Sequence, residues 1–208
     1  MNIYAKMVKG EPEFFKNPLI TSEGHTYNPP PEALLSAGYK SYSEETFDEL
    51  KSKTHDITFE YHETKTEIRK VWVYVPNMEK AKVVKLTEIN AACDSILNSA
   101  VSTYPETEVL TFDQQTSEAN VYLQTKKPED VPLLSALALG RGITLDDLVQ
   151  RVIAKHTAFS VLSGHIIGQR QALEDRLDEC KTVEDVEAIV VDIKLPDTSQ
   201  NEEEVTEE

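Results

Sequence analysis

The sequence predicts an α+β protein: a small β-rich N-terminal module, then an α-helical bundle or hairpin domain, then a disordered acidic tail. Apolar and polar residues alternate in parts of the first eighty residues, which is the period of a half-buried strand. From Lys80 the apolar residues recur every three or four positions, as in amphipathic helices. We therefore expect a β-rich attachment module at residues 1–79, a helical domain at 80–195 and the tail at 196–208.

The N-terminal module begins with an expected strand at residues 2–8, NIYAKMV, after which Gly10 bends the chain. Three consecutive prolines then hold the chain extended, and the last of them, Pro31, is placed to start a short helix. Gly38 is expected to end that helix, because glycine adopts the left-handed conformation that closes a helix.

Residues 57–75 predict a β-hairpin. Ile57, Phe59 and Tyr61 alternate with polar residues, and the return run is apolar on both faces. We interpret Trp72 in that run as a packing residue and not as a ligand-stacking one. The linker to the helical domain is expected at Pro76–Lys80.

The helical domain is expected to contain five helices, within residues 85–104, 113–127, 130–142, 146–179 and 182–193. Thr144 and Thr182 stand three residues before an aspartate, which predicts that each caps the helix that follows. Gly164 and Gly168 lie one turn apart in the longest helix, and we expect them to interrupt that helix or to pack it closely. The tail lacks anchors and is expected to be disordered.

The polar segment 103–125 is interpreted as a corner between two helices and not as a catalytic site. Thr111 or Asp113 can accept hydrogen bonds from the open amides of the next helix. Glu118, with the two glutamines before it, can satisfy other backbone groups at the corner. No neighbouring residue in the sequence would shift the pKa of these carboxylates for acid–base chemistry.

Composition weakens the case for a nucleic-acid partner. The formal charge is −16, from 37 acidic and 21 basic residues, and an acidic protein repels phosphate backbones. A local basic group is interpreted as a solvated face; its members are Lys65, Arg69, Lys70, Lys80, Lys82 and Lys85. No apolar run has the length of a signal peptide or a membrane span. We expect no membrane contact and synthesis in a cytoplasm.

No catalytic, cofactor-binding or metal-binding residue is predicted. The histidines have no metal-ligand spacing; they are His25, His55, His62, His156 and His165. Cys93 and Cys180 are 87 positions apart and are interpreted as small buried residues in a reducing compartment. The Gly-Arg-Gly run at 140–142 is too short for a phosphate-binding loop.

Several short motifs in residues 86–190 occur in the order seen in a domain of bacteriophage proteins. The matching residues are Tyr104, Pro105 and Glu108; Phe112, Gln115, Glu118 and Ala119; Pro132 to Leu134; Arg141 and Gly142; and Ile166 to Gln171. Together they resemble a domain of unknown function found in phage tail-fibre and tail-associated proteins. Phe112 departs from the pattern, which often has tryptophan at that position.

This resemblance implies a non-enzymatic virion component of the tail, tail fibre or neck, which acts through protein–protein contacts with other phage structural proteins. It also implies a homo-oligomer, in which Gly164 and Gly168 could pack the long helix against a copy of itself. Two alternatives stay open: an assembly chaperone for the tail fibre that is absent from the mature particle, and an enzyme whose site is assembled in the fold around Glu118, His156 or Arg170.

Overall fold

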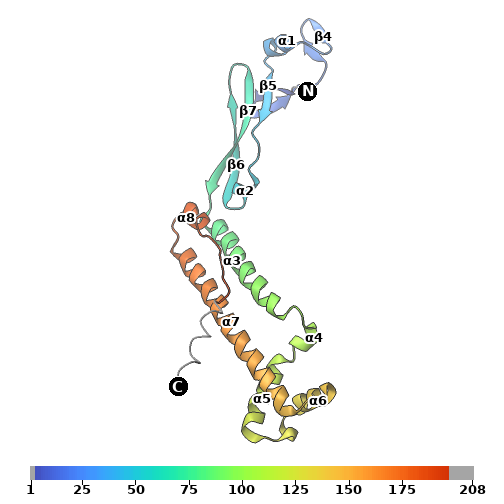
Figure 1. The fold of residues 1–208 in the computed structure, drawn as a ribbon. Helices are drawn as coiled ribbons and strands as arrows, with labels where there is room; N and C mark the ends of the chain where they lie inside the picture. Colours follow the sequence, from blue (N-terminus) through green and yellow to red (C-terminus); the bar gives the residue numbers. More distant parts are fainter. Residues whose placement is uncertain (1–2, 197–208) are drawn as a thin grey trace. The chain divides into compact units, whose positions relative to one another are not determined.

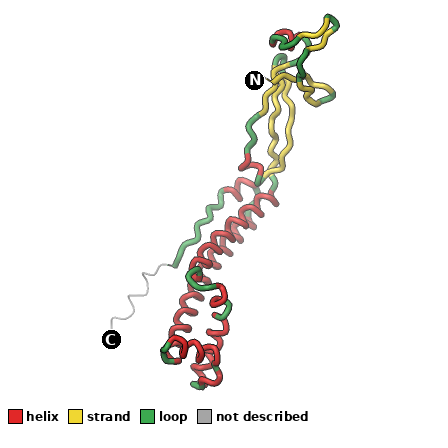
Figure 2. The backbone as a smooth tube through the Cα atoms, turned by 90° about the vertical axis from the view of Figure 1, so that its right-hand side faces the viewer, coloured by secondary structure: helices red, strands yellow, loops and turns green. Residues whose placement is uncertain are grey.

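The structure, a computed structural model, describes residues 3–196. Contacts between residues divide the chain into two compact units, Met1–Val84 and Lys85–Glu208. Strands fall in the first unit and helices make up most of the second, as the colours of Figure 2 show. The predicted α+β class, with a β-rich module before the helices, is confirmed. Beyond Pro196 the predicted tail lies outside the described residues.

The first unit is built on a five-stranded sheet with the order β2-β1-β5-β7-β6; strands β5, β6 and β7 are labelled in Figure 1. Its strands are β1 (Ile3–Val8), β2 (Glu11–Phe14), β5 (Lys40–Glu44), β6 (His55–Glu63) and β7 (Glu67–Pro76). The β5–β7 pair is parallel and the other pairs are antiparallel. A separate two-stranded sheet is formed by β3 (Leu19–Thr21) and β4 (Gly24–Thr26), and the unit also has two short helices, α1 (Pro31–Ser36) and α2 (Glu49–Ser52).

The predicted strand, short helix and hairpin of this unit are all present. Pro31 is the first residue of α1, and Gly38 follows the helix with a φ of 85°, as expected for a closing glycine. The bend at Gly10 proves to be a tight hairpin, in which Lys9 and Gly10 both have positive φ. The sequence did not predict that the chain returns there as strand β2.

The second unit consists of helices joined by short connections. Helix α3 (Met78–Val101) begins two residues after β7 ends, so the predicted linker at Pro76–Lys80 is wrong. The remaining helices are α4 (Glu106–Val109), α5 (Phe112–Thr125), the 3₁₀ turn η1 (Pro128–Asp130), α6 (Pro132–Arg141), α7 (Leu145–Glu179) and α8 (Val183–Glu187). All five predicted helices are present, but the last one ends at Glu187 and not at Ile193 as predicted. Helices α4 and η1 were not predicted.

One hydrophobic core of this unit lies where α5, α6 and α7 meet. Its buried members are Ala119, Tyr122, Val131, Leu134, Ala138, Leu148 and Val149. After α8 the chain runs back along α7 (Figure 1), where the side-chain amide of Gln169 accepts from the Lys194 N–H at 2.9 Å and donates to the Lys194 carbonyl at 2.8 Å. This double hydrogen bond holds the segment after α8 against the long helix.

Two of the three helix caps predicted from the sequence are present. The Thr144 hydroxyl accepts from the Asp147 N–H at 3.1 Å, and Thr182 and Asp185 form a complete capping box. The expected cap at Thr111 is wrong, because this residue has helical dihedrals and its hydroxyl donates backwards to the Glu108 carbonyl. Asp113 lies inside the first turn of α5 and makes no cap.

Gly164 and Gly168 neither interrupt α7 nor pack it closely. The helix is continuous through both, and a Cβ atom placed on either would have no heavy atom within 4 Å. The expectation of close packing is therefore wrong for the described chain, which places open space beside both glycines.

The capping box of α8 gives a pH-dependent contribution to stability. Hydrogen bonds from Thr182, and then from the Lys181 amide, lower the pKa of Asp185. A lowered pKa stabilises the folded state above the unfolded-state pKa of about 3.9, and this stabilisation is lost as the pH falls through the folded pKa. At pH 7 we expect the free energy of unfolding, measured by urea unfolding, to be larger for wild type than for Asp185→Asn, and we expect this difference to be smaller at pH 3. An equal difference at both pH values would contradict this.

Candidate protein interaction surface

Strand β6 forms one edge of the five-stranded sheet and is largely uncovered. Seven of its nine residues are exposed, including Ile57 and Phe59 at 37% and 42%. Its register with β7 is unbroken over nine residue pairs, so no bulge bends it away. It also has no proline or lysine, two residues that commonly block pairing at sheet edges. We call the outer side of this strand the β6 edge.

The backbone groups that face outward can be assigned from the ends of the β6–β7 ladder. The Thr64 N–H donates to the Glu67 carbonyl at 2.8 Å, and the Asn77 N–H donates to the Thr54 carbonyl at 3.0 Å. Hydrogen-bonded pairs alternate along an antiparallel ladder, so the even-numbered residues of β6 bond to β7. The odd-numbered residues therefore direct their N–H and C=O groups away from the sheet.

These outward groups are unpaired over the middle of the strand. Within residues 3–196, the backbone N–H and C=O groups of Ile57, Phe59 and Tyr61 form no hydrogen bond to another part of the chain. The opposite edge of the sheet differs, since β2 has four residues and one of them is Pro12. The β6 edge is thus the longer and less protected of the two edges.

An aromatic cluster lies on the face of the sheet beside the β6 edge. The ring centroid of Trp72 is 5.9 Å from that of Phe59 and 5.1 Å from that of Phe47, both edge-to-face. The Lys70 ammonium lies 4.2 Å from the Trp72 ring centroid, and the Trp72 indole N–H donates to the Glu45 carbonyl at 3.2 Å. All these contacts are with the chain itself, which agrees with the interpretation of Trp72 as a packing residue.

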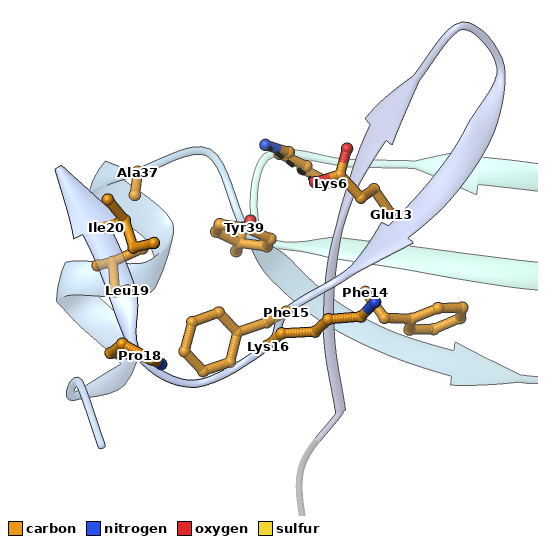
Figure 3. Close-up of a pocket in the computed structure, with 10 residues that line it drawn as sticks. All are labelled: Lys6, Glu13, Phe14, Phe15, Lys16, Pro18, Leu19, Ile20, Ala37 and Tyr39. Atoms are coloured by element: carbon orange, nitrogen blue, oxygen red, sulfur yellow. Dashed lines mark ion pairs between the residues drawn. The ribbon is translucent and has the colours of Figure 1, made fainter. Parts of the chain in front are cut away.

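A pocket of about 370 Å³ lies elsewhere in the first unit, between the β1–β2 hairpin and α1 (Figure 3). Leu19 and Ile20 line it beside the helix, and Lys6 and Glu13 line it on the hairpin, 3.4 Å apart. Tyr39, and then Glu13, raise the pKa of Lys6. Because a lysine base needs a lowered pKa, this arrangement does not favour acid–base catalysis.

Glu118, one of three residues considered for an enzyme site, connects two helices. It is 9% exposed; one carboxylate oxygen accepts from the Leu134 N–H of α6 at 2.9 Å, and the other accepts from the Gln114 side chain at 3.0 Å. The first turn of α6 receives no cap from its own N-cap residue, Val131. Glu118 therefore supplies from α5 the cap that α6 lacks.

The other two residues have different partners. Arg170 donates to Asn90 of α3 at 3.1 Å and pairs with Glu174 at 2.9 Å, whereas His156 is exposed and contacts Ser160. Both belong to α7, about 21 Å apart along the helix axis. The structure does not bring the three candidate residues together.

The basic residues singled out in the sequence are mostly matched by carboxylates. Lys80 pairs with Asp56 at 2.7 Å and Lys85 with Glu88 at 2.8 Å, and longer pairs join Arg69 to Glu45 and Lys70 to Glu44.

Within residues 3–196, no group of three or more His, Cys, Asp or Glu side chains is placed to hold a metal ion. In the same part of the chain, no helix combines the length and apolarity needed to cross a membrane.

Sequence reasoning found strand β6 but not its role as an edge. The signal that was available is the composition of residues 55–63, which combine strand periodicity with the absence of proline, glycine and lysine. Strand order, which depends on residues far apart in the sequence, decides whether such a strand lies at an edge or in the middle of a sheet.

Comparison with known proteins corrects the resemblance to phage tail-fibre domains. The family model of the HI1402 helical domain matches residues 154–194, which are most of α7, α8 and the segment held by Gln169. No comparison points to a tail-fibre domain, so that resemblance is wrong. No solved structure matches the chain.

Similarity to a protein of Haemophilus influenzae shows the family of the chain. An uncharacterized protein of Haemophilus influenzae is 42% identical over 62 residues, which are 30% of this chain and 91% of the Haemophilus protein. Nearly the whole of that protein is thus aligned with less than a third of this one. The chain belongs to the same family as this Haemophilus influenzae protein.

Proposed function

We propose that the chain is a non-enzymatic protein that acts by binding another protein chain along the β6 edge. The observation that carries the proposal is the row of unpaired backbone groups at Ile57, Phe59 and Tyr61. An extended segment of another chain can add to such an edge as a further strand, with main-chain hydrogen bonds supplying affinity. Side chains beside the edge then supply specificity.

Two of the three residues considered for an enzyme site, and Lys6 beside the pocket, have structural roles. Glu118 caps a helix, Arg170 joins α3 to α7, and Lys6 is held by Tyr39 and Glu13. Each of these polar groups already has a partner that explains its position. The predictions of a virion component and of an assembly chaperone stay untested, and they have lost the resemblance on which they rested.

Site-specific photocrosslinking tests the proposal with a matched control. A benzophenone amino acid replaces Phe59 in one variant and Phe14 in the other, since Phe14 is 43% exposed and lies on the opposite edge strand. In the cells that produce the protein, we expect protein-sized adducts from position 59 at a clearly higher yield than from position 14. Equal yields, or no adduct from position 59, would exclude the β6 edge as the binding surface.

A further inference from the structure

We infer that the chain bound at the β6 edge is a second copy of this protein, paired antiparallel about a two-fold axis at Phe59. This inference rests on the proposed function and names the partner of the same surface. The two five-stranded sheets would then form one continuous ten-stranded sheet. Such an interface is isologous and closes on itself, because each copy contributes the same strand.

The backbone geometry permits this pairing. In an antiparallel pair with Phe59 opposite Phe59, each odd-numbered residue faces another odd-numbered residue. These are the residues of β6 whose N–H and C=O groups point away from β7. Every outward group from Ile57 to Tyr61 therefore meets a group of the second copy with which it can exchange hydrogen bonds.

The side chains of β6 are complementary to themselves in this register. The opposed pairs are Phe59 with Phe59, Ile57 with Tyr61, Thr58 with Glu60, Asp56 with His62, and His55 with Glu63. The two apolar pair types lie together at the centre, and each imidazole faces a carboxylate that can accept its N–H hydrogen bond. No like charges lie directly opposite each other.

The two neighbouring registers lack this complementarity. Moving the axis to Glu60 places two copies of that glutamate opposite each other. Moving it to Thr58 places Asp56 opposite Glu60 at two positions. Like charges directly across a pair of strands are destabilising, so the sequence of β6 favours the register centred on Phe59.

The rest of the sheet limits assembly to two copies. The only other edge of the five-stranded sheet is β2, where Pro12 lacks an N–H and only four residues pair. The chain has a formal charge of −16, which makes two copies repel at long range. At about 0.15 M salt the Debye length is about 8 Å, so contacts within the paired strands decide the association.

Two substitutions of Thr58 give a matched test of the partner and the register. Thr58 is exposed and, as an even-numbered residue, faces Glu60 of the second copy twice in the dimer. Thr58→Glu adds two like-charge pairs and Thr58→Lys adds two opposite-charge pairs, on the same background. By sedimentation velocity of the full chain over a dilution series in 0.15 M salt, wild type should form a species of twice 23.4 kDa. Relative to it, the dissociation constant should rise roughly two- to thirtyfold in Thr58→Glu and fall by a similar factor in Thr58→Lys.

A third variant tests the central hydrogen bonds and the Phe59 contact together. Phe59→Pro removes an outward N–H and the ring at the dimer axis without removing a β6–β7 hydrogen bond, so it should abolish the dimer while urea unfolding followed by Trp72 fluorescence still shows a cooperative transition of the sheet. A monomeric wild type, or two Thr58 variants that shift in the same direction, would overturn the inference. If the pure chain is monomeric but position 59 still crosslinks to another protein in cells, the second copy is excluded and the binding function stands. If neither the dimer nor the crosslink is observed, both the inference and the proposed function are excluded.

Discussion

Replacing Glu118 with alanine is expected to destabilise the helical unit by about 3 kcal/mol, because a buried amide loses its acceptor and two hydrogen bonds to a carboxylate are lost. The affected amide belongs to Leu134, which is fully buried in the α5–α6–α7 core. Glu118→Gln keeps one acceptor oxygen and should cost about 1 kcal/mol. Urea unfolding followed by circular dichroism at 222 nm measures both.

An exposed glutamate of the same unit provides the control. Glu129 lies in η1 and is exposed, so Glu129→Ala should change the free energy of unfolding by less than about 0.5 kcal/mol. If Glu118→Ala lowered the free energy of unfolding as little as Glu129→Ala does, the Glu118 carboxylate would not be the cap of α6. A large loss in both alanine and glutamine variants would instead mean that the negative charge is required.

Features that depend on neighbours in sequence could be predicted. Pro31 and Gly38 bound α1, Thr144 and Thr182 cap the helices after them, and each signal acts within four residues. The change of apolar spacing near Lys80 likewise separated strands from helices, because periodicity reports which face of an element is buried. Local chemistry was sufficient for these elements.

Features that depend on residues far apart in the sequence could not be predicted. Glu118 caps a helix sixteen residues away, and nothing in the spacing of segment 103–125 shows that α6 folds back beside α5. The parallel β5–β7 pair joins residues about 26 positions apart, and it determines that β6 is an edge strand. The candidate interaction surface therefore appeared only once the strand order was known.

Replacing Ile68 with alanine is expected to destabilise the β-sheet unit selectively, by about 4 kcal/mol, because burial is lost and a cavity is left unfilled. Ile68 lies on β7 and is fully buried, and few other residues of the first unit share that environment: Ala5, Leu19, Leu34 and Ala81 are the buried apolar residues described there. A core with so few large side chains has little stability in reserve. Ile68→Val, which removes one methyl group, should cost about 1 kcal/mol.

The single tryptophan allows unfolding of the sheet to be followed separately from unfolding of the helical unit. Trp72 lies on the same strand as Ile68, so its fluorescence reports on the sheet, whereas circular dichroism at 222 nm reports mainly on the helices. At fixed protein concentration, Ile68→Ala should move the fluorescence transition to lower urea and leave the dichroism transition nearly in place. Ile20→Ala, at a site 68% exposed in the same unit, should move neither. If Ile68→Ala moved both transitions together, the two units would unfold as one, and the thin core of the sheet would depend on the helices for its stability.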